Sequence, residues 1–363
     1  RWKRKIKQMS KKRILFLGET YRADAITWMN GLRELGDFEI VTWELHTSST
    51  GINRMSRLFE LAKAIITIKS IAKKFNPDMV IAERTTSYGY LASVSGIKPI
   101  AIAQQGITDL WPHSSPLYIF KKMLQDHAFK KADLIHAWGN VMENHMKESN
   151  VDMSKVMVLP KGINLDYFEF KDNHNDTMIN AIVTRTLQPE YQHDLILKAF
   201  SIIKQKNIPF KLTIIGDGTE LKKLKALAKE LNIGNEVIFA GKINNNDIPE
   251  FLQQANFYIS TPTTEGVSAS LFEAMACGCF PIVSDLPGNR SWIQQKVNGI
   301  LVTIENEFNL AEELEWAFNN NGFTKTAVTQ NRKFVEENAN YKINMKKIAQ
   351  AYHGLINNKS SSL

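Results

Sequence analysis

The sequence predicts an α/β protein built from two doubly wound domains, and three observations support this. The chain has 363 residues, about twice the length of an ordinary single core. Short apolar runs alternate with longer amphipathic runs, a pattern typical of parallel strands covered by helices. The alternation stops once, at residues 163–177, and then starts again. We therefore expect two Rossmann-like domains facing one another across a cleft, with ligands at the carboxyl ends of the strands.

In the first half, the short apolar runs lack polar alternation, which indicates strands buried on both faces. The expected strands are 13–17, 38–43, 79–82, 99–104, 134–137 and 155–159. Amphipathic runs between them predict the helices 23–35, 53–75, 88–95, 117–130 and 141–149. Residues 13–165 then form the first domain, and residues 166–178 form a linker because they are polar and show neither period.

The second half repeats the pattern over residues 179–340. The expected strands are 179–184, 211–216, 237–240, 257–260, 281–284 and 299–302. The expected helices are 193–206, 219–231, 248–254, 268–277, a short one near Ser291 and a long one from Leu310. A last helix at 341–357 is expected to pack on the outside of the second sheet.

Composition excludes several classes of protein. Hydrophobic residues make up 44% and charged residues 23%, which excludes a disordered, collagen-like or multi-span membrane chain. The two cysteines, Cys277 and Cys279, lie too close together to staple a secreted scaffold, and no Cys/His cluster has zinc spacing. We therefore expect a reducing, cytoplasmic compartment and no metal site.

The net charge of +8 resides at the N-terminus. Residues 1–13 hold eight bases and no acid, so the rest of the chain is neutral. A basic leader at residues 1–12 does not suit a nucleic-acid partner, which would need bases spread over a folded face. It suits either an anionic membrane surface, at ~1 kcal/mol per base, or a solubilising tail. The helices expected at 53–75 and 117–130 are also basic and amphipathic, so they either lie on lipid or cover the sheet. We expect peripheral contact with the inner face of the cell membrane and no membrane span.

The stretch 261–285 is the most informative part of the chain. Glu265 and Gly266 follow an expected strand, and Val267 and Ser268 open an expected helix whose free N–H groups favour an anion. Glu273 lies eight residues after Glu265, so two carboxylates flank this anion site and could accept hydrogen bonds from sugar hydroxyls. The alternative is that a glutamate at a helix start only stabilises the helix dipole.

Several motifs in order give the sequence a family resemblance. Glu265-Gly266, then Glu273-Ala274-Met275-Ala276 after seven intervening residues, resembles the E-x7-E signature of family 4 glycosyltransferases. Further matches are Pro160-Lys161-Gly162-Ile163-Asn164, Ile215-Gly216-Asp217-Gly218, Val237-Ile238-Phe239-Ala240-Gly241, Pro287-Gly288 and Asn298-Gly299. The resemblance covers residues 13–357 and is stronger in the second domain.

The resemblance implies a GT-B fold and a retaining transfer of a sugar from a nucleoside diphosphate donor to a glycan or lipid-linked acceptor, as in bacterial polysaccharide biosynthesis. No cofactor besides the donor is implied, and no metal, and the chain contains no Asp-x-Asp triplet. Glu273 would hold the donor ribose and Glu265 the sugar hydroxyls. The N–H groups of Gly266, Val267 and Ser268 would hold the diphosphate.

Arg185 and the base pocket are also implied by the resemblance. Arg185 matches the arginine of the family that binds the pyrophosphate, and a charged planar fork suits a leaving group on which charge grows. Its alternative is a surface salt bridge. Gly241 and Ile243 lie where the family lines the base pocket. Among these residues, we expect Glu265 and Arg185 to take part in the chemistry.

The sequence departs from the family pattern at two positions. Tyr191 stands where the family commonly has a lysine, and its phenol would donate to a phosphate oxygen instead. Gln105 stands where many members have a histidine near the reacting centre, so histidine-assisted chemistry is not expected. Asp109 is a second candidate for acceptor contact, or a cap of the following turn. Gly18 would let the backbone approach the diphosphate.

Two other functions fit the same residues. A nucleotide-sugar epimerase would need a donor and no acceptor. A catalytically silent scaffold that binds sugar nucleotides would bind them without turnover, as the missing lysine and histidine would allow.

Overall fold

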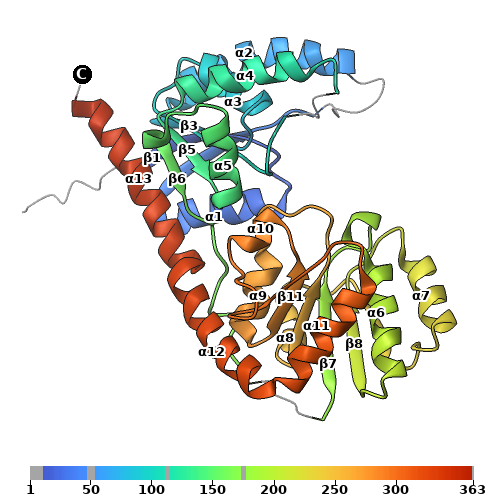
Figure 1. Ribbon diagram of the computed structural model, residues 1–363. Helices are drawn as coiled ribbons and strands as arrows, with labels where there is room; N and C mark the ends of the chain where they lie inside the picture. The colour runs from blue at the N-terminus through green and yellow to red at the C-terminus, as the bar shows by residue number, and fades with distance from the viewer. Residues whose placement is uncertain (1–10, 47–53, 111–113, 173–176, 362–363) are drawn as a thin grey trace, which may run out of the picture. The chain divides into compact units, whose positions relative to one another are not determined.

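The computed structural model describes residues 11–46, 54–110, 114–172 and 177–361 (Figure 1). The chain divides into two compact units, an N-terminal unit of residues 1–161 with 342–363 and a C-terminal unit of residues 162–341. Most of the basic leader expected at residues 1–12 lies outside the described residues. Each unit has the doubly wound architecture that the sequence predicts.

The N-terminal unit is built on a parallel sheet with the strand order β2-β1-β3-β4-β5-β6 in its described part. In chain order its elements are β1 Lys12–Leu17, α1 Ala23–Gly36, β2 Phe38–Trp43, α2 Arg54–Phe75, β3 Met79–Ala82, α3 Ser87–Val94, β4 Ile100–Ala103, α4 Tyr118–Lys131, β5 Leu134–Ala137, α5 Asn140–Glu148, a 3₁₀ turn Met153–Lys155, β6 Val156–Val158 and, from the far end of the chain, α13 Tyr341–Ser361.

Helices cover both faces of this sheet. From β1 the chain moves to β2 at one edge of the sheet, and from β2 it crosses back to β3 and continues toward β6 at the other edge. Because such crossovers are right-handed, α1 lies on one face of the sheet and α2 to α5 lie on the other. The helix α13 shares the face of α1, because Trp28 of α1 and Tyr352 of α13 both contact His136 of β5. The structure therefore corrects the expectation that the last helix packs on the second sheet.

The C-terminal unit has a second parallel sheet, with the described strand order β12-β11-β10-β7-β8-β9. Its elements are β7 Ile179–Thr184, a 3₁₀ turn Pro189–Tyr191, α6 His193–Gln205, β8 Phe210–Ile215, α7 Leu221–Glu230, β9 Val237–Gly241, α8 Ile248–Leu252, β10 Phe257–Ser260, α9 Ala269–Cys277, β11 Phe280–Ser284, α10 Pro287–Arg290, β12 Ile300–Val302, α11 Glu307–Asn319 and α12 Asn321–Asn338.

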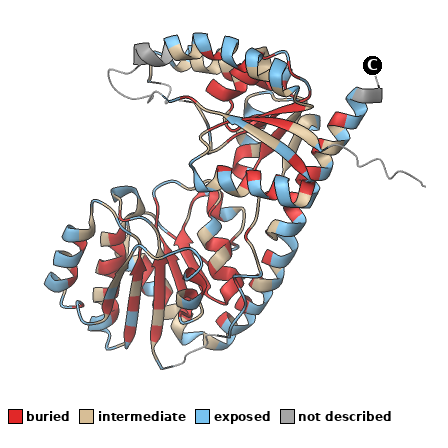
Figure 2. Cartoon of the chain, turned by 180° about the vertical axis from the view of Figure 1, so that it is seen from behind, coloured by how far each residue is buried: buried red, intermediate tan, exposed pale blue. Residues whose placement is uncertain are grey.

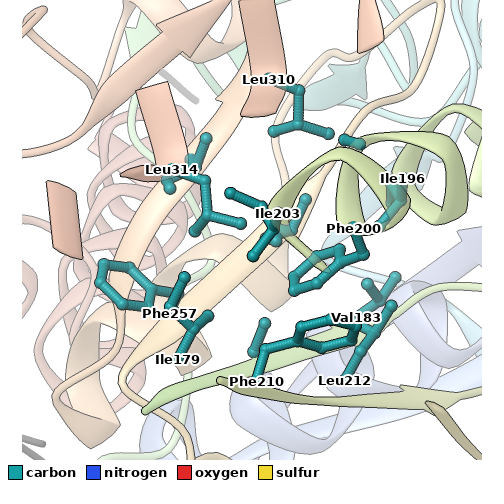
Figure 3. Close-up of a cluster of buried hydrophobic side chains, with 14 of the residues drawn as sticks. Ile179, Val183, Ile196, Phe200, Ile203, Phe210, Leu212, Phe257, Leu310 and Leu314 are labelled. Atoms are coloured by element: carbon teal, nitrogen blue, oxygen red, sulfur yellow. The ribbon is translucent and has the colours of Figure 1, made fainter. Parts of the chain in front are cut away.

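A hydrophobic cluster holds the helices α6 and α11 to one face of this sheet (Figure 3). Phe200 and Ile203 of α6 and Leu314 of α11 are fully buried there. Burial of a side chain of this size stabilises a fold by about 1.5–3 kcal/mol. Figure 2 shows the same distribution over each sheet, with buried strands and helices exposed on their outer sides. This packing fixes the strand ends that carry the candidate site.

Two segments differ from the sequence prediction. The chain leaves the N-terminal unit after Lys161 rather than at residues 166–178. Ile163 and Phe168 are buried in the C-terminal unit, because they pack in the cluster around α9. The long helix expected from Leu310 is broken at Asn320, which separates α11 from α12.

Candidate functional site

The loop from β10 to α9 in the C-terminal unit forms the start of the candidate site. Ser260 ends β10, and Ser268 caps α9, its hydroxyl accepting a hydrogen bond from the N–H of Leu271 at 3.2 Å. A serine in extended conformation at this position is a preferred helix start. The helix ends at Gly278, whose φ of +94° suits glycine. The first N–H groups of α9 are therefore placed as helix starts that suit an anion.

Arg185 lies directly after β7 and reaches this loop. Its guanidinium donates to the hydroxyl of Ser260 at 3.2 Å, to the carboxylate of Glu265 and to the hydroxyl of Ser268. The side chains of Arg185 and Glu265 are only 14% and 12% exposed. The strands β7 and β10 are neighbours in the sheet, which is why side chains 80 positions apart in the sequence meet here. The salt bridge of Arg185 is thus mostly buried, whereas the alternative considered from the sequence was a salt bridge on the surface.

The surroundings of Arg185 keep it charged. Burial lowers its pKa, but the neighbouring Tyr258, Glu265 and Tyr191 raise the pKa above its ordinary value. The guanidinium carbon lies 5.4 Å from the centre of the Tyr191 ring, a distance typical of a cation–π contact. A permanent, partly buried positive charge at a helix N-terminus suits a phosphate group.

Glu273 lies further along α9 and has no hydrogen-bond partner among the described residues. Burial raises its pKa to about 7, although the charge of Arg185 lowers it. A carboxyl group with this pKa is partly protonated at neutral pH, so it can accept or donate a hydrogen bond. Its carboxyl group can therefore form a hydrogen bond with a hydroxyl group of a ligand.

Two glycines allow neighbouring loops to pack against the site. Gly216 has a φ of +145°, and a Cβ there would lie 2.1 Å from the carbonyl oxygen of Arg185. A Cβ on Gly288, in α10, would lie 2.2 Å from the carbonyl oxygen of Glu265. The backbone at both ends of the Arg185–Glu265 pair is therefore fixed by close contacts that only glycine permits.

The remaining donor-side residues also lie in the C-terminal unit. Gly266 and Val267 connect Glu265 to the cap of α9. Gly241 ends β9, and its carbonyl accepts the N–H of Gly216 at 2.9 Å, which ties β9 to the loop that follows β8. Ile243 packs at the margin of the cluster around α9. Their roles toward a ligand stay predictions.

The expected acceptor-side residues gather in the N-terminal unit. Asp109 is tied to its own unit, because its carboxylate accepts the N–H of Thr85 at 2.8 Å, the hydroxyl of Thr85 at 2.9 Å and the N–H of Gln105 at 3.4 Å. Burial raises the pKa of Asp109. The side-chain nitrogen of Gln105 is buried without a partner among the described residues. Contact of Asp109 or Gln105 with an acceptor stays a prediction.

Gly18 follows β1 and packs on Glu83, a buried acid for which the sequence carries no motif. A Cβ on Gly18 would lie 2.6 Å from Oε2 of Glu83, which also accepts the N–H of Glu19 at 2.6 Å. Burial raises the pKa of Glu83 to about 7. The need for glycine at this turn is therefore explained by packing within the unit.

Sequence reasoning also missed Ser260 and His193. Ser260 is the last residue of a buried strand and precedes the informative stretch, so its position at a strand end is the signal that could have found it. His193 begins α6 beside Arg185, and burial lowers its pKa to about 4, so it is neutral. In the described ranges, no three His, Cys, Asp or Glu side chains gather into a metal-binding group, and no described helix is long and apolar enough to span a membrane.

Family models match both units. Residues 166–339 match the glycosyl transferases group 1 model, and residues 14–138 match the glycosyl transferase 4-like model. The chain belongs to the group 1, family 4 glycosyltransferases. The first match contains Arg185, Glu265 and Glu273, and the second contains Gln105 and Asp109.

Relatives and solved structures agree with this assignment. The glycosyltransferase is 23% identical over 248 residues to the uncharacterized glycosyltransferase MJ1069 of Methanocaldococcus jannaschii, covering 66% of this chain and 63% of that protein. It is 23% identical over 290 residues to an N-acetylgalactosamine-N,N'-diacetylbacillosaminyl-diphospho-undecaprenol 4-alpha-N-acetylgalactosaminyltransferase of Campylobacter jejuni, covering 77% of this chain and 78% of the relative. The crystal structure of Anabaena HepE with UDP matches with a TM-score of 0.77 and 15% identity, over 95% of this chain and 100% of that one. The fold is thus GT-B.

Proposed function

We propose that this glycosyltransferase moves a sugar, with retention of anomeric configuration, from a nucleoside diphosphate donor to a lipid-linked glycan. The observation that carries the proposal is the convergence of Arg185, Glu265 and Ser268 at the N-terminus of α9. This arrangement supplies positive charge for a diphosphate and a carboxylate for sugar hydroxyls in one place.

The donor would bind along the first two turns of α9, from the loop before Ser268 to Glu273. Its diphosphate would lie on the N–H groups of Gly266, Val267 and Ser268, with Arg185 donating to the phosphate oxygens. Glu265 would accept from the donor sugar, and Glu273 would bind the ribose hydroxyls. The base would contact the backbone at Gly241 and Ile243, while Tyr191 would donate to the diphosphate in place of the family lysine.

Bond breaking leaves negative charge on the outer phosphate of the nucleotide. Arg185 and the helix terminus would stabilise that charge more strongly as the glycosidic bond breaks. In a front-face transfer, the departing phosphate oxygen takes the proton of the acceptor hydroxyl as the new bond forms on the same side of the ring. No protein base is then required, which agrees with a glutamine at position 105 that cannot take up a proton. We propose that the reaction needs neither a metal ion nor a cofactor.

The acceptor assignment draws on the relatives. The Campylobacter enzyme is named for a diphospho-undecaprenol acceptor and an alpha linkage, and its match extends over most of both chains. A lipid-linked acceptor of this kind places the reaction at the cytoplasmic face of the cell membrane, in bacterial-type glycan biosynthesis. The basic leader, of which residues 1–10 lie outside the described part, would add attraction to that surface.

An activity screen that varies the donor and the acceptor independently tests this proposal. The full chain is incubated with UDP-, GDP- and ADP-sugars, with and without undecaprenyl-diphosphate-linked saccharides, in a chelator, and products are followed by mass spectrometry and NMR. The proposal predicts a new glycosidic bond with the anomeric configuration of the donor, and it requires the acceptor. Epimerised sugar from the donor alone would instead show an epimerase, and binding without turnover would show a silent scaffold.

A further inference from the structure

We infer that the outward faces of α2 and α4 form a docking surface for an anionic lipid bilayer. This inference rests on the proposed lipid-linked acceptor and adds the surface by which the enzyme meets the membrane. We call this surface the α2/α4 face. Its described members are Phe59, Lys63, Ile66, Lys69, Lys73 and Lys74 of α2, with Ile119, Phe120, Met123, Lys130 and Lys131 of α4.

Large apolar side chains are exposed on both helices. Phe59 is 67%, Ile66 73%, Ile119 72% and Met123 64% exposed. These residues do not lie on the core-facing side of their helices, because that side is formed by other, buried residues, such as Ile68 of α2. Single exposed apolar residues are ordinary, but a group of them on neighbouring helices marks an interaction site.

The two helices lie in the same layer of the N-terminal unit. Both are on the face opposite to α1, and α3 packs against each of them (Figure 1). The helix α2 follows β2 and α4 follows β4, and all strands of this sheet are parallel. Both helices therefore begin at the carboxyl edge of the sheet and lie in one layer over the same face of it.

The positive charge of this face indicates an anionic partner. The helix α2 contains six bases and one acid, and α4 contains four bases and one acid. The acids are already engaged, because Glu60 accepts the N–H of His46 at 2.7 Å and Asp126 pairs with Lys122 at 2.6 Å. The hydrocarbon region of an anionic bilayer can bury the exposed apolar side chains, and its charged head groups can pair with the lysines. A second copy of this chain would bring the same positive charges together.

The position of the apolar residues links this face to the proposed acceptor. Along both helices the exposed apolar residues precede the exposed lysine pairs Lys73–Lys74 and Lys130–Lys131. The apolar part is thus nearer the helix starts, at the edge of the sheet where Gln105 and Asp109 follow β4. A lipid anchor held in the membrane at this face would place its head group beside that edge.

Vesicle co-sedimentation of the full chain tests the inference. The wild type should bind vesicles of phosphatidylcholine with phosphatidylglycerol and release them at high salt, with little binding to phosphatidylcholine alone. Replacing Ile119 and Met123 by serine should weaken binding about tenfold or more. Replacing Lys130 and Lys131 by alanine should weaken it about tenfold to thirtyfold. Matched controls in the C-terminal unit, Phe308→Ser at a 65% exposed site and Lys222→Ala, should bind as the wild type does.

Stabilisation of each variant by a nucleoside diphosphate reports on folding and on the donor site. Unchanged stabilisation together with lost vesicle binding supports the α2/α4 face. Equal binding to both vesicle types, or wild-type binding by both face variants, would overturn the inference while leaving the proposed transfer intact. Self-association in sedimentation that the same variants abolish, without vesicle binding, would assign the face to a second copy.

Discussion

At the scale of single residues, Arg185 is the group on which the proposed donor site depends. Its guanidinium donates hydrogen bonds to Ser260 at the end of β10, and to Glu265 and Ser268 in the loop that follows β10. The guanidinium is therefore held in one orientation before any ligand binds, which reduces the entropy lost on binding. Glu265 compensates the charge of Arg185 in the described chain. In the proposed function it would then lie beside the diphosphate and accept from the donor sugar.

The two glutamates of the E-x7-E pair should differ in what their loss affects. Glu273→Gln should weaken binding of the nucleoside diphosphate about tenfold, because a hydrogen bond to a carboxylate is worth about 1.5–3 kcal/mol. Glu265→Gln should leave that affinity within a few-fold and lower kcat about tenfold to a hundredfold. Calorimetry and initial rates measure the two effects, with the exposed Glu250→Gln as the control. Normal binding and turnover in both variants would contradict the site assignment.

The buried acid Glu83 should make stability depend on pH. Its folded pKa of about 7 lies above its ordinary value of 4.5, so the folded state holds a proton that the unfolded state releases between these values. Glu83 should therefore make stability fall as the pH rises through this window, and Glu83→Gln should make the fall smaller than in the wild type, by up to about 3 kcal/mol. The rest of the fall comes from groups that the variant keeps, such as Glu273, whose pKa is also raised to about 7. The charged neighbours of Glu83, which are Glu19, Arg22, Asp24 and Arg84, stay in place in the variant.

Denaturant unfolding at a series of pH values checks this prediction. Parallel curves for the wild type and the Glu83→Gln variant from pH 4.5 to 8 would show that the carboxyl group has its ordinary pKa in the folded state.

At the scale of elements, both α9 and α13 were predictable as helices, but the sheet that α13 packs on was not. Ser268, an apolar helical run and Gly278 mark both ends of α9 locally. The helix α13 is amphipathic, but nothing in its own sequence states which sheet its buried side contacts. Its contacts are specific: the Tyr352 hydroxyl lies 2.6 Å from Nε2 of His136, and His353 binds the carbonyl of Gly36 at 2.8 Å.

Removing the Tyr352 hydroxyl should destabilise the N-terminal unit selectively. Tyr352→Phe leaves a fully buried imidazole nitrogen without its partner, at a cost of about 1–3 kcal/mol. The pKa of His136 is lowered to about 3 by burial, so the ring cannot compensate by ionising near neutral pH. Hydrogen exchange should rise in β5 and α13 and stay unchanged in α9. The control is Tyr167→Phe, 58% exposed in the C-terminal unit. Increased exchange confined to the C-terminal unit would contradict the placement of α13.

At the scale of the whole molecule, periodicity predicted both sheets because buried parallel strands and their helices repeat with little ambiguity. The sequence also places the donor-side residues at strand ends, where β7 and β10 bring Arg185 and Glu265 together. It could not predict Glu83 beneath Gly18 or the hydrogen bonds of Asp109 to Thr85, because these depend on loop paths without a periodic signal. The unit boundary at Lys161 was missed for a similar reason, since Ile163 and Phe168 are isolated apolar residues in a polar segment.

The proposed function requires an intact site for a nucleoside diphosphate sugar in the C-terminal unit. Thermal unfolding of the full chain with UDP, GDP, ADP and their sugar conjugates tests it most directly, with Arg185→Ala as the negative control. One base series should stabilise the wild type, by about 2.7 kcal/mol at a hundredfold excess over Kd, and should leave the stability of the variant unchanged. No stabilisation by any of these nucleotides, or equal stabilisation of wild type and variant, would contradict it.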